Sequence, residues 1–257
     1  MELGLSGKCA LVTGGSRGLG RHAALALAKE GCHVAICARG LEALDQTVAD
    51  LKGLHVRAFG VQADVTKEAD ASHLFRETVN ASGPVDVLVN NVEGSLGRDF
   101  DSADDAAWEY ALQLNLFSTI RLTRLVLPGM KEKGWGRIIN IASIWGREQG
   151  GGLAYMTAKA ALIAFSKHLA IEVAGTGITV NTVAPGSITF PGGNWQRFQD
   201  TNTPEVVQDF VKNNLPMGRF GWPEPVGALV AFLASTQADL MTGTCINIDG
   251  GQSKSLI

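Results

Sequence analysis

The sequence has no long apolar segment, no run of basic residues and no excess of charge of one sign. Its longest apolar stretches stop well short of the ~18 residues that a membrane-spanning helix requires. A formal net charge of −3, without a lysine or arginine cluster, provides no electrostatic footprint for nucleic acid. We therefore expect neither membrane insertion nor nucleic-acid binding.

Cysteine and histidine are also sparse. The four cysteines, Cys9, Cys32, Cys37 and Cys245, lack CxxC spacing, and three lie in apolar runs, which predicts buried reduced thiols. The five histidines form no HExxH or similar ligand cluster, so we expect no catalytic metal. The first residues show no basic segment followed by an apolar one, and we expect a cytoplasmic protein.

What the chain does contain is a regular alternation of two patterns. It has 257 residues, 46% of them apolar, and 31 glycines, which suits one compact domain over 1–257. Short apolar runs typical of buried strands lie at 8–13, 33–38, 56–61, 85–90, 136–142, 177–184 and 244–248. Helical patterns, including 41–51, 106–133, 155–174 and 225–233, separate them. This alternation predicts a Rossmann-type, doubly wound parallel sheet with helices on both faces.

One irregular segment interrupts the alternation near its end. The stretch from about 186 to 224 contains several prolines, yet it also carries Trp195, Phe198, Phe210 and Phe220. Long loops in compact domains are commonly lids, and these aromatic residues make a disordered segment a poor interpretation. We predict a partly helical substrate lid.

A phenol and an ammonium lie four residues apart at the start of the helical pattern at 155–174. Residues i and i+4 share one helical face, so Tyr155 and Lys159 can point into one cavity. A nearby ammonium favours the phenolate and lowers a tyrosine pKa, which suits proton transfer near neutrality. The hydroxyl of Ser143 could hold a substrate oxygen beside that phenol.

A glycine-rich turn follows the first predicted strand. Its residues Gly14, Ser16, Arg17, Gly18, Leu19 and Gly20 belong to the stretch TGGSRGLG, which opens the next helix. Glycines permit close backbone approach, and a helix N-terminus offers unpaired N–H groups to an anion. The turn therefore favours a bound nucleotide.

The second strand bears on which nucleotide. Dinucleotide sites that prefer NAD end this strand in a carboxylate, which accepts hydrogen bonds from the adenosine ribose. This strand ends in Cys37-Ala38-Arg39 instead. Arg39 and Arg17 could together clamp a 2′-phosphate, so NADP(H) is predicted in preference to NAD(H).

These motifs together resemble the short-chain dehydrogenase/reductase family, and its 3-oxoacyl-(acyl-carrier-protein) reductase-like branch in particular. They occur in family order across the whole chain: TGxxxGxG, Asp64-Val65, Asn90-Asn91, Asn115, Ser143, Tyr155-x3-Lys159 and Pro185-Gly186. The resemblance implies a sheet of about seven strands, a nicotinamide cofactor, a small-molecule carbonyl or alcohol substrate, and a homotetramer or homodimer.

The resemblance also implies a role for each matching residue. Tyr155 would be the general acid/base, Ser143 would hold the substrate oxygen, and Lys159 would bind the nicotinamide ribose and lower the tyrosine pKa. Asn115 matches the asparagine that holds a water on the proton-relay path. The remaining matches are to the cofactor: Asp64 and Val65 to adenine, Asn91 to the adenosine ribose, and Pro185, Gly186, Ile188 and Thr189 to the nicotinamide end.

The chain departs from the family pattern after the fourth strand. The family usually has Asn-Asn-Ala-Gly there, whereas this chain has Asn90-Asn91-Val92-Glu93. Val92 adds bulk, and Glu93 brings a carboxylate close to the expected position of the nicotinamide.

The predicted function is NADP(H)-dependent interconversion of a carbonyl and a secondary alcohol by hydride transfer. Alternatives are a 3-oxoacyl-(acyl-carrier-protein) reductase, a sugar or polyol dehydrogenase and, from another class, a redox-sensing regulator without turnover. We expect a free small molecule as substrate. Reductases of this branch that dock acidic carrier protein have two arginines where this chain has Gly134 and Thr176.

Overall fold

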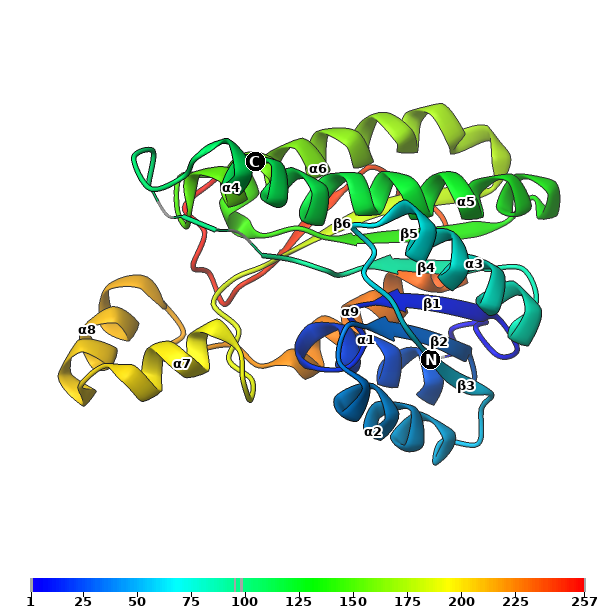
Figure 1. Ribbon diagram of the computed structural model, residues 1–257, viewed down its shortest axis with the longest axis horizontal. Coiled ribbons are helices and arrows are strands. Elements are labelled where there is room, and N and C mark those ends of the chain that lie inside the picture. The colour runs from blue at the N-terminus through cyan, green and yellow to red at the C-terminus, as the bar shows by residue number, and fades with distance from the viewer. Residues whose placement is uncertain (1, 95, 98, 257) are drawn as a thin grey trace.

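The computed structural model describes residues 2–94, 96–97 and 99–256, and in this part of the chain a seven-stranded sheet forms the centre (Figure 1). The strands are β1 (Cys9–Thr13), β2 (His33–Ala38), β3 (Ala58–Gln62), β4 (Val87–Asn90), β5 (Gly136–Ile141), β6 (Ile178–Pro185) and β7 (Cys245–Ile248). Their order is β3-β2-β1-β4-β5-β6-β7, and every neighbouring pair is parallel. Strands β1 to β3 are added toward one edge of the sheet and β4 to β7 toward the other, so the strand order switches between β1 and β4. Such sheets bind ligands at this switch point.

Helices cover both faces of the sheet, as the alternation predicts. One face carries α1 (Gly18–Lys29), α2 (Leu41–Lys52) and α9 (Pro223–Ala234), and the other carries α3 (Glu68–Ser82), α5 (Ser118–Lys133) and α6 (Leu153–Val173). Each face has its own apolar core: the first core lies under α1, α2 and α9, and the second under α3, α5 and α6. Successive strand residues point to opposite faces, so Ala10 and Val12 are buried in the first core and Leu11 in the second. Burial on both faces explains why the strands read as continuous apolar runs.

The long helix predicted over 106–133 is interrupted. It consists of α4 (Asp105–Leu112), one π-helical turn (Gln113–Phe117) and α5. The π turn contains Asn115, whose side-chain amide donates to the carbonyl oxygen of Ala111 at 2.8 Å. The predicted long helix is therefore confirmed, with a π turn in its middle that the sequence did not indicate. π turns inside helices are frequent at functional sites.

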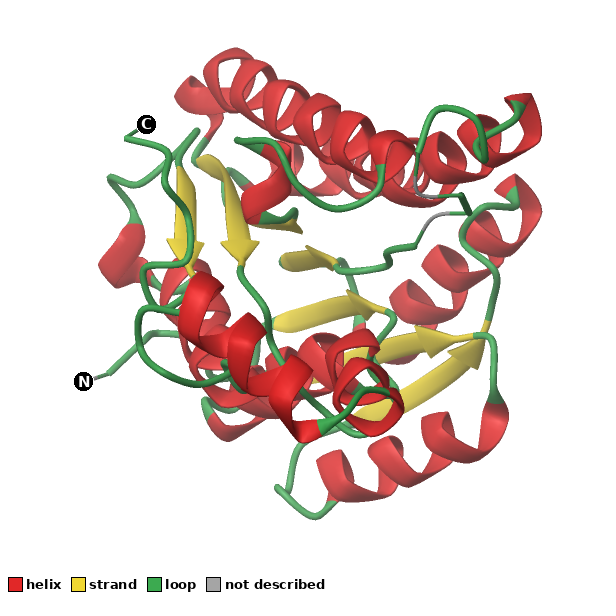
Figure 2. Cartoon of the chain, turned by 90° about the vertical axis from the view of Figure 1, so that its left-hand side faces the viewer, coloured by secondary structure: helices red, strands yellow, loops and turns green. Residues whose placement is uncertain are grey.

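The segment predicted to form a lid contains two helices, α7 (Asn194–Thr201) and α8 (Pro204–Asn214). They follow β6 and lie on the side of the molecule toward which the strands point, in front in Figure 2. Their helical structure agrees with the sequence, whereas their role as a lid stays a prediction.

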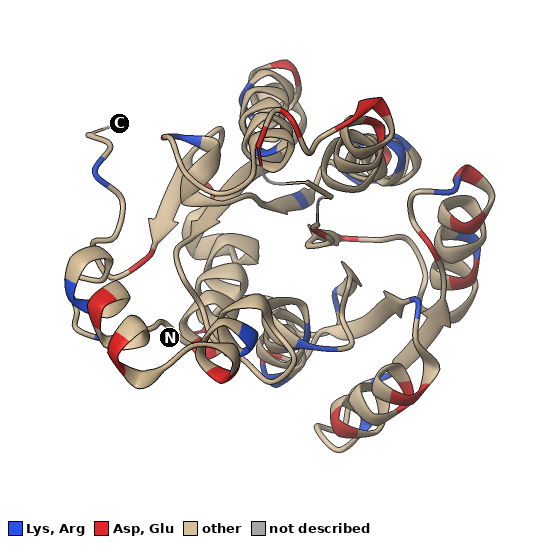
Figure 3. Ribbon diagram, turned by 60° about the vertical axis from the view of Figure 1, so that its left-hand side comes forward, with Lys and Arg blue, Asp and Glu red and all other residues tan. Residues whose placement is uncertain are grey.

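Charged residues of both signs are spread over the outer helices, and the strands between them are almost free of charge (Figure 3). Within residues 2–94, 96–97 and 99–256, no helix combines the length and apolarity needed to cross a bilayer.

Candidate active site

The carboxyl ends of β4, β5 and β6 surround the residues predicted to be catalytic. Ser143 follows β5, and its Oγ accepts a hydrogen bond from the backbone N–H of Trp145 at 3.2 Å. Tyr155 and Lys159 lie in the first turns of α6, with the lysine Nζ 5.5 Å from the centre of the tyrosine ring. The Ser143 side chain lies close enough to Tyr155 to act on its pKa, which it lowers. The structure thus brings Ser143, Tyr155 and Lys159 together.

Lys159 is completely buried, and its Nζ donates to the carbonyl oxygen of Ile141 at 2.8 Å. Burial penalises the charged form and lowers the pKa of Lys159 to about 8, while the nearby Glu93 carboxylate acts in the opposite direction. A buried lysine with a perturbed pKa is typical of a functional site.

The Tyr155 hydroxyl donates a hydrogen bond to Glu93 Oε2 at 2.8 Å, across 62 positions of sequence. Burial raises the pKa of Tyr155 well above its ordinary value, and the charge and hydrogen bond of Glu93 raise it further, against the effect of Ser143. The sequence led us to expect a lowered pKa. That expectation fails, because burial and the Glu93 carboxylate raise the pKa of Tyr155 by more than Ser143 lowers it.

Asn115 holds the loop that carries Glu93. Its side-chain amide donates to the carbonyl oxygen of Gly94 at 2.7 Å and accepts from the Gly94 N–H at 3.4 Å. The π turn therefore connects the long helix to the loop after β4, and this connection fixes the backbone beside Glu93. The water-holding role of Asn115 stays a prediction.

The glycine-rich turn lies between β1 and α1. Gly14 and Gly18 have φ of +61° and +54°, a region that residues with a Cβ rarely adopt. A Cβ on Gly20 would lie 2.3 Å from the carbonyl oxygen of Gly14, so the turn closes tightly only with glycine there. Among the described residues no side chain caps the start of α1, which leaves its first N–H groups available to an anion. This turn suits a dinucleotide pyrophosphate.

Neighbouring residues fasten the same turn. Asn91 donates its side-chain N–H groups to the carbonyl oxygens of Thr13 and Gly14 at 3.2 and 3.3 Å. The carbonyl oxygen of Ser16 accepts from Thr47 Oγ1 at 3.0 Å, and Leu19 packs on the first core. The side-chain nitrogen of Asn91 is engaged in these two hydrogen bonds. The predicted contact with the adenosine ribose would therefore involve the side-chain oxygen or the backbone of Asn91.

The residues predicted at the adenosine end lie at the ends of β2 and β3. Arg39 follows β2 and is exposed, while Val65 is buried. Burial raises the pKa of Asp64, but hydrogen bonds from Thr66 and the charge of Arg39 outweigh it and lower that pKa. Arg17 is also exposed, and its guanidinium lies 3.7 Å from the position of a Cβ on Gly192. The two arginines therefore contact different partners, and their joint clamp on a phosphate stays a prediction.

The segment after β6 forms the opposite wall. β6 ends at Pro185, and the Gly186 N–H donates to the carbonyl oxygen of Ile248 at 3.2 Å. Ile188 is buried, the Thr189 N–H donates to the Gly221 carbonyl oxygen at 2.9 Å, and Thr189 Oγ1 accepts from Gln199 of α7 at 2.9 Å. The predicted nicotinamide segment is thus tied to α7.

Aromatic side chains connect α7 and α8 to the loop that follows Ser143. The ring of Trp145 lies 6.0 Å from that of Trp195, which in turn contacts Phe198, Phe210 and Phe220. Gly150 and Gly151 accommodate Trp145, since a Cβ on either would lie within 2.7 Å of its ring. A cavity of about 290 Å³ opens next to this loop, lined by Asp99, Phe100, Gln149, Gly150, Gly151, Leu153 and Met156.

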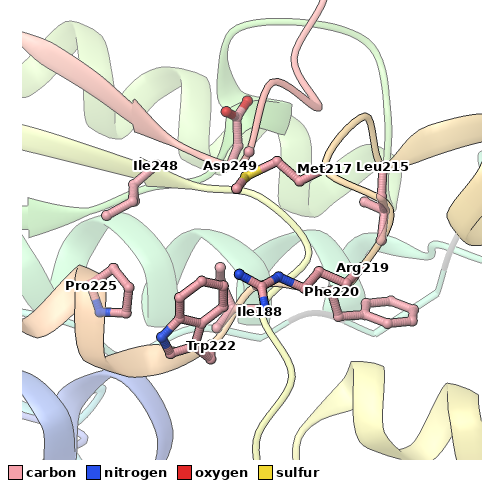
Figure 4. A pocket seen from close by; sticks show the side chains of 11 residues that line it. Ile188, Leu215, Met217, Arg219, Phe220, Trp222, Pro225, Ile248 and Asp249 are labelled. Atoms are coloured by element: carbon pink, nitrogen blue, oxygen red, sulfur yellow. The ribbon is translucent and has the colours of Figure 1, made fainter.

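A second cavity of about 220 Å³ lies behind Ile188 (Figure 4). Its walls are mostly apolar, and at one side the guanidinium of Arg219 stacks 4.4 Å from the ring centre of Trp222. Phe220 lines this cavity and also contacts Trp195, so the cavity adjoins the aromatic cluster of α7 and α8.

A doubly wound sheet with this glycine turn and this Ser-Tyr-Lys cluster is typical of nicotinamide-dependent oxidoreductases. Residues 8–201 match the model of the short chain dehydrogenase family. The chain is 37% identical over 255 residues to 3-oxoacyl-(acyl-carrier-protein) reductase FabG of Aquifex aeolicus, covering 98% of this chain and 99% of the relative. It belongs to the short-chain dehydrogenase family, and it is an oxidoreductase.

Solved structures agree with this assignment. A 7α-hydroxysteroid dehydrogenase complexed with NADH and 7-oxo glycochenodeoxycholic acid matches with a TM-score of 0.90 and 30% identity, over 100% of this chain and 98% of that one. L-sorbose reductase from Gluconobacter frateurii, complexed with NADPH and L-sorbose, matches with a TM-score of 0.90 and 32% identity over the whole of both chains. The cofactors named for these two proteins differ, and so do the substrates.

Two residues at the site were not among those predicted to bind or react. Glu93 was noted for its unusual place in the family pattern, and its contact with Tyr155 explains why that departure matters. Phe190 lies directly against the glycine turn, with ring atoms 2.6 Å from the position of a Cβ on Gly18. Nothing in the local sequence indicates this second contact, because it depends on the path of the chain after β6.

Proposed function

We propose that this protein is an NADP(H)-dependent oxidoreductase that interconverts a carbonyl and a secondary alcohol, with Tyr155 as general acid/base. The observation that carries the proposal is the convergence of the Tyr155 hydroxyl, the Ser143 hydroxyl and the buried Lys159. A phenol within hydrogen-bond reach of a second hydroxyl can exchange a proton with an oxygen held between them.

Each residue then has a distinct role. Ser143 donates a hydrogen bond to the substrate oxygen and orients it toward Tyr155. Lys159 contributes a positive charge that favours the phenolate when the site is loaded. Asn115 holds the loop after β4 in place, and the aromatic residues of α7 and α8 close the site from the lid side.

The turn at 14–20 would hold the pyrophosphate of the cofactor, and Ile188 and Thr189 its nicotinamide end. When bound, the nicotinamide supplies or accepts the hydride. Arg39 at the end of β2, where an NAD-binding chain carries a carboxylate, supports NADP(H). The relatives crystallised with NADPH and with NADH leave both cofactors to be tested.

The test is nicotinamide-linked turnover with a panel of ketones, hydroxyketones, sugars and secondary alcohols, each with both cofactors. We expect reduction of at least one carbonyl class with NADPH and none by Tyr155→Phe. Binding of NADPH without turnover on any panel member would instead favour the regulator.

We further propose that the substrate is a free small molecule. The turns at 131–135 and 174–177 contain Gly134 and Thr176 at the two arginine positions, precede β5 and β6, and carry no arginine. Of Lys131 and Lys133, the two lysines that could replace an arginine, Lys133 is paired with the buried Asp86, whereas Lys131 is exposed. Comparing one 3-oxoacyl group on carrier protein and on a short thiol mimic tests this. A preference for the carrier-bound form that weakens with salt would overturn it.

A further inference from the structure

Glu93 occupies a position that nothing in the proposed mechanism uses. It follows β4, is exposed, and accepts the hydrogen bond of the Tyr155 hydroxyl at 2.8 Å. The adjacent Gly94 is held by Asn115, so the carboxylate is placed by a loop fixed to the π turn. The contact joins an exposed carboxylate to the reacting oxygen of the site.

The direction of this hydrogen bond matches one direction of the reaction. A phenolic oxygen can donate its own hydrogen and accept another at the same time. With its hydrogen on Glu93, Tyr155 presents a lone pair to the oxygen held beside Ser143. An alcohol can donate to that lone pair, whereas a carbonyl requires the phenolic hydrogen itself. The arrangement therefore suits alcohol oxidation.

Other neighbours of Tyr155 are less suited to pass a proton to solvent. Lys159 is completely buried and donates to the carbonyl oxygen of Ile141. Both amide hydrogens of Asn115 are used, on Gly94 and on Ala111. Glu93, in contrast, is exposed to water, so a proton that reaches it leaves the site in one step.

We propose that Glu93 is a second proton-transfer residue of this enzyme, an inference that rests on the proposed function. As the alcohol is oxidised, its hydroxyl proton passes to Tyr155 Oη, the tyrosine's own proton passes to Glu93 Oε2, and Glu93 releases it to water. The C–H bond breaks with its electron pair, which the oxidised nicotinamide takes up as hydride, and the C=O double bond forms. The products are a carbonyl, the reduced nicotinamide and one proton.

Within residues 2–94, 96–97 and 99–256, several elements contribute groups that face this pair or its loop. Lys159 comes from α6 and Ser143 from the end of β5. Tyr110 of α4 has its hydroxyl 3.8 Å from the position of a Cβ on Gly94, and Asp99 lines the cavity beside the start of α6. The Glu93 charge contributes to the raised pKa of Tyr155, after burial, so removing that charge should lower it.

The first test needs no cofactor. The chain has two tyrosines, so in a Tyr110→Phe background the tyrosinate absorbance reports Tyr155 alone. Glu93→Gln, which keeps an acceptor oxygen but removes the charge, should lower the midpoint of that titration measurably. Glu132→Gln, an exposed carboxylate near the end of α5, should leave it unchanged. An unchanged midpoint in Glu93→Gln overturns the inference.

The second test measures proton transfer. In Glu93→Gln we expect kcat for alcohol oxidation to fall about a hundredfold with KM little changed, and its pH profile to lose one ionisation. Added formate should restore turnover in Glu93→Gly, which a purely structural role would not allow. Wild-type turnover in both variants refutes the role of Glu93, whereas absence of nicotinamide-linked turnover in the unmodified protein refutes the proposed function instead.

Discussion

The buried ammonium of Lys159 should impose a measurable pH dependence on stability. Its pKa is lowered by burial from an ordinary value of 10.5 to about 8 in the folded chain. Between these two values the unfolded chain binds more protons at this site than the folded one, so stability gains a contribution that rises with pH. From pH ~7 to ~9.5 the gain amounts to about 2 kcal/mol.

The perturbation is Lys159→Met, which keeps the length of the side chain and removes the charge. It leaves the carbonyl oxygen of Ile141 without its donor, at a cost of about 1–3 kcal/mol that does not depend on pH. The free energy of unfolding of the variant should therefore lack the rising contribution. The difference between wild type and variant should move by about 2 kcal/mol in favour of wild type from pH ~7 to ~9.5.

The assay is urea denaturation of wild type and Lys159→Met at several pH values. The quantity compared is the difference between their free energies of unfolding at each pH. Absolute stabilities will fall in alkali in both proteins, because burial raises the pKa of Cys9, Cys32 and Cys37 to about 12 and the unfolded thiols ionise first. Lys167→Met, on the exposed side of α6, is the control and should give a difference independent of pH. Parallel curves for wild type and Lys159→Met would refute the reasoning.

Three further predictions concern the site. Tyr155→Phe should lower kcat at least ~10²-fold and leave NADPH affinity, measured by calorimetry, nearly unchanged, since the ring still packs; substantial remaining activity would contradict the acid/base role. Arg39→Asp should erase or invert a preference for NADPH that we place at about 1–3 kcal/mol, and equal binding of NADH and NADPH by wild type would remove the basis for NADP(H). Gly20→Ala should destabilise the fold by about 1–3 kcal/mol, because its Cβ would lie 2.3 Å from the Gly14 carbonyl oxygen, whereas Gly129→Ala, with open space around it, should stabilise α5 in thermal melts.

Local geometry explains what could be predicted. The parallel sheet follows from apolar runs that alternate with helical patterns, because each pattern has its own period and its own face to bury. The spacing of Tyr155 and Lys159 places them on one helical face for the same reason. The glycine turn was recognisable because its backbone conformation tolerates few other residues.

The sequence alone did not indicate the electrostatics of the site. An ammonium four residues from a phenol suggests a lowered tyrosine pKa, but burial and Glu93 raise the pKa of Tyr155 instead. The π turn at Asn115 was equally hidden, because the bond to Gly94 that accompanies it lies 21 positions away in the sequence.

The sequence by itself therefore determined the helices and strands, their order along the chain and the candidate catalytic side chains Ser143, Tyr155 and Lys159. The tertiary structure decided which of them meet: Glu93 with Tyr155, Trp145 with Trp195, and Phe190 with Gly18. These contacts depend on which strands are neighbours in the sheet and on where each loop leaves its strand. Such long-range choices are made by the packing of the whole core, whereas a helical turn or a strand is specified within a few residues.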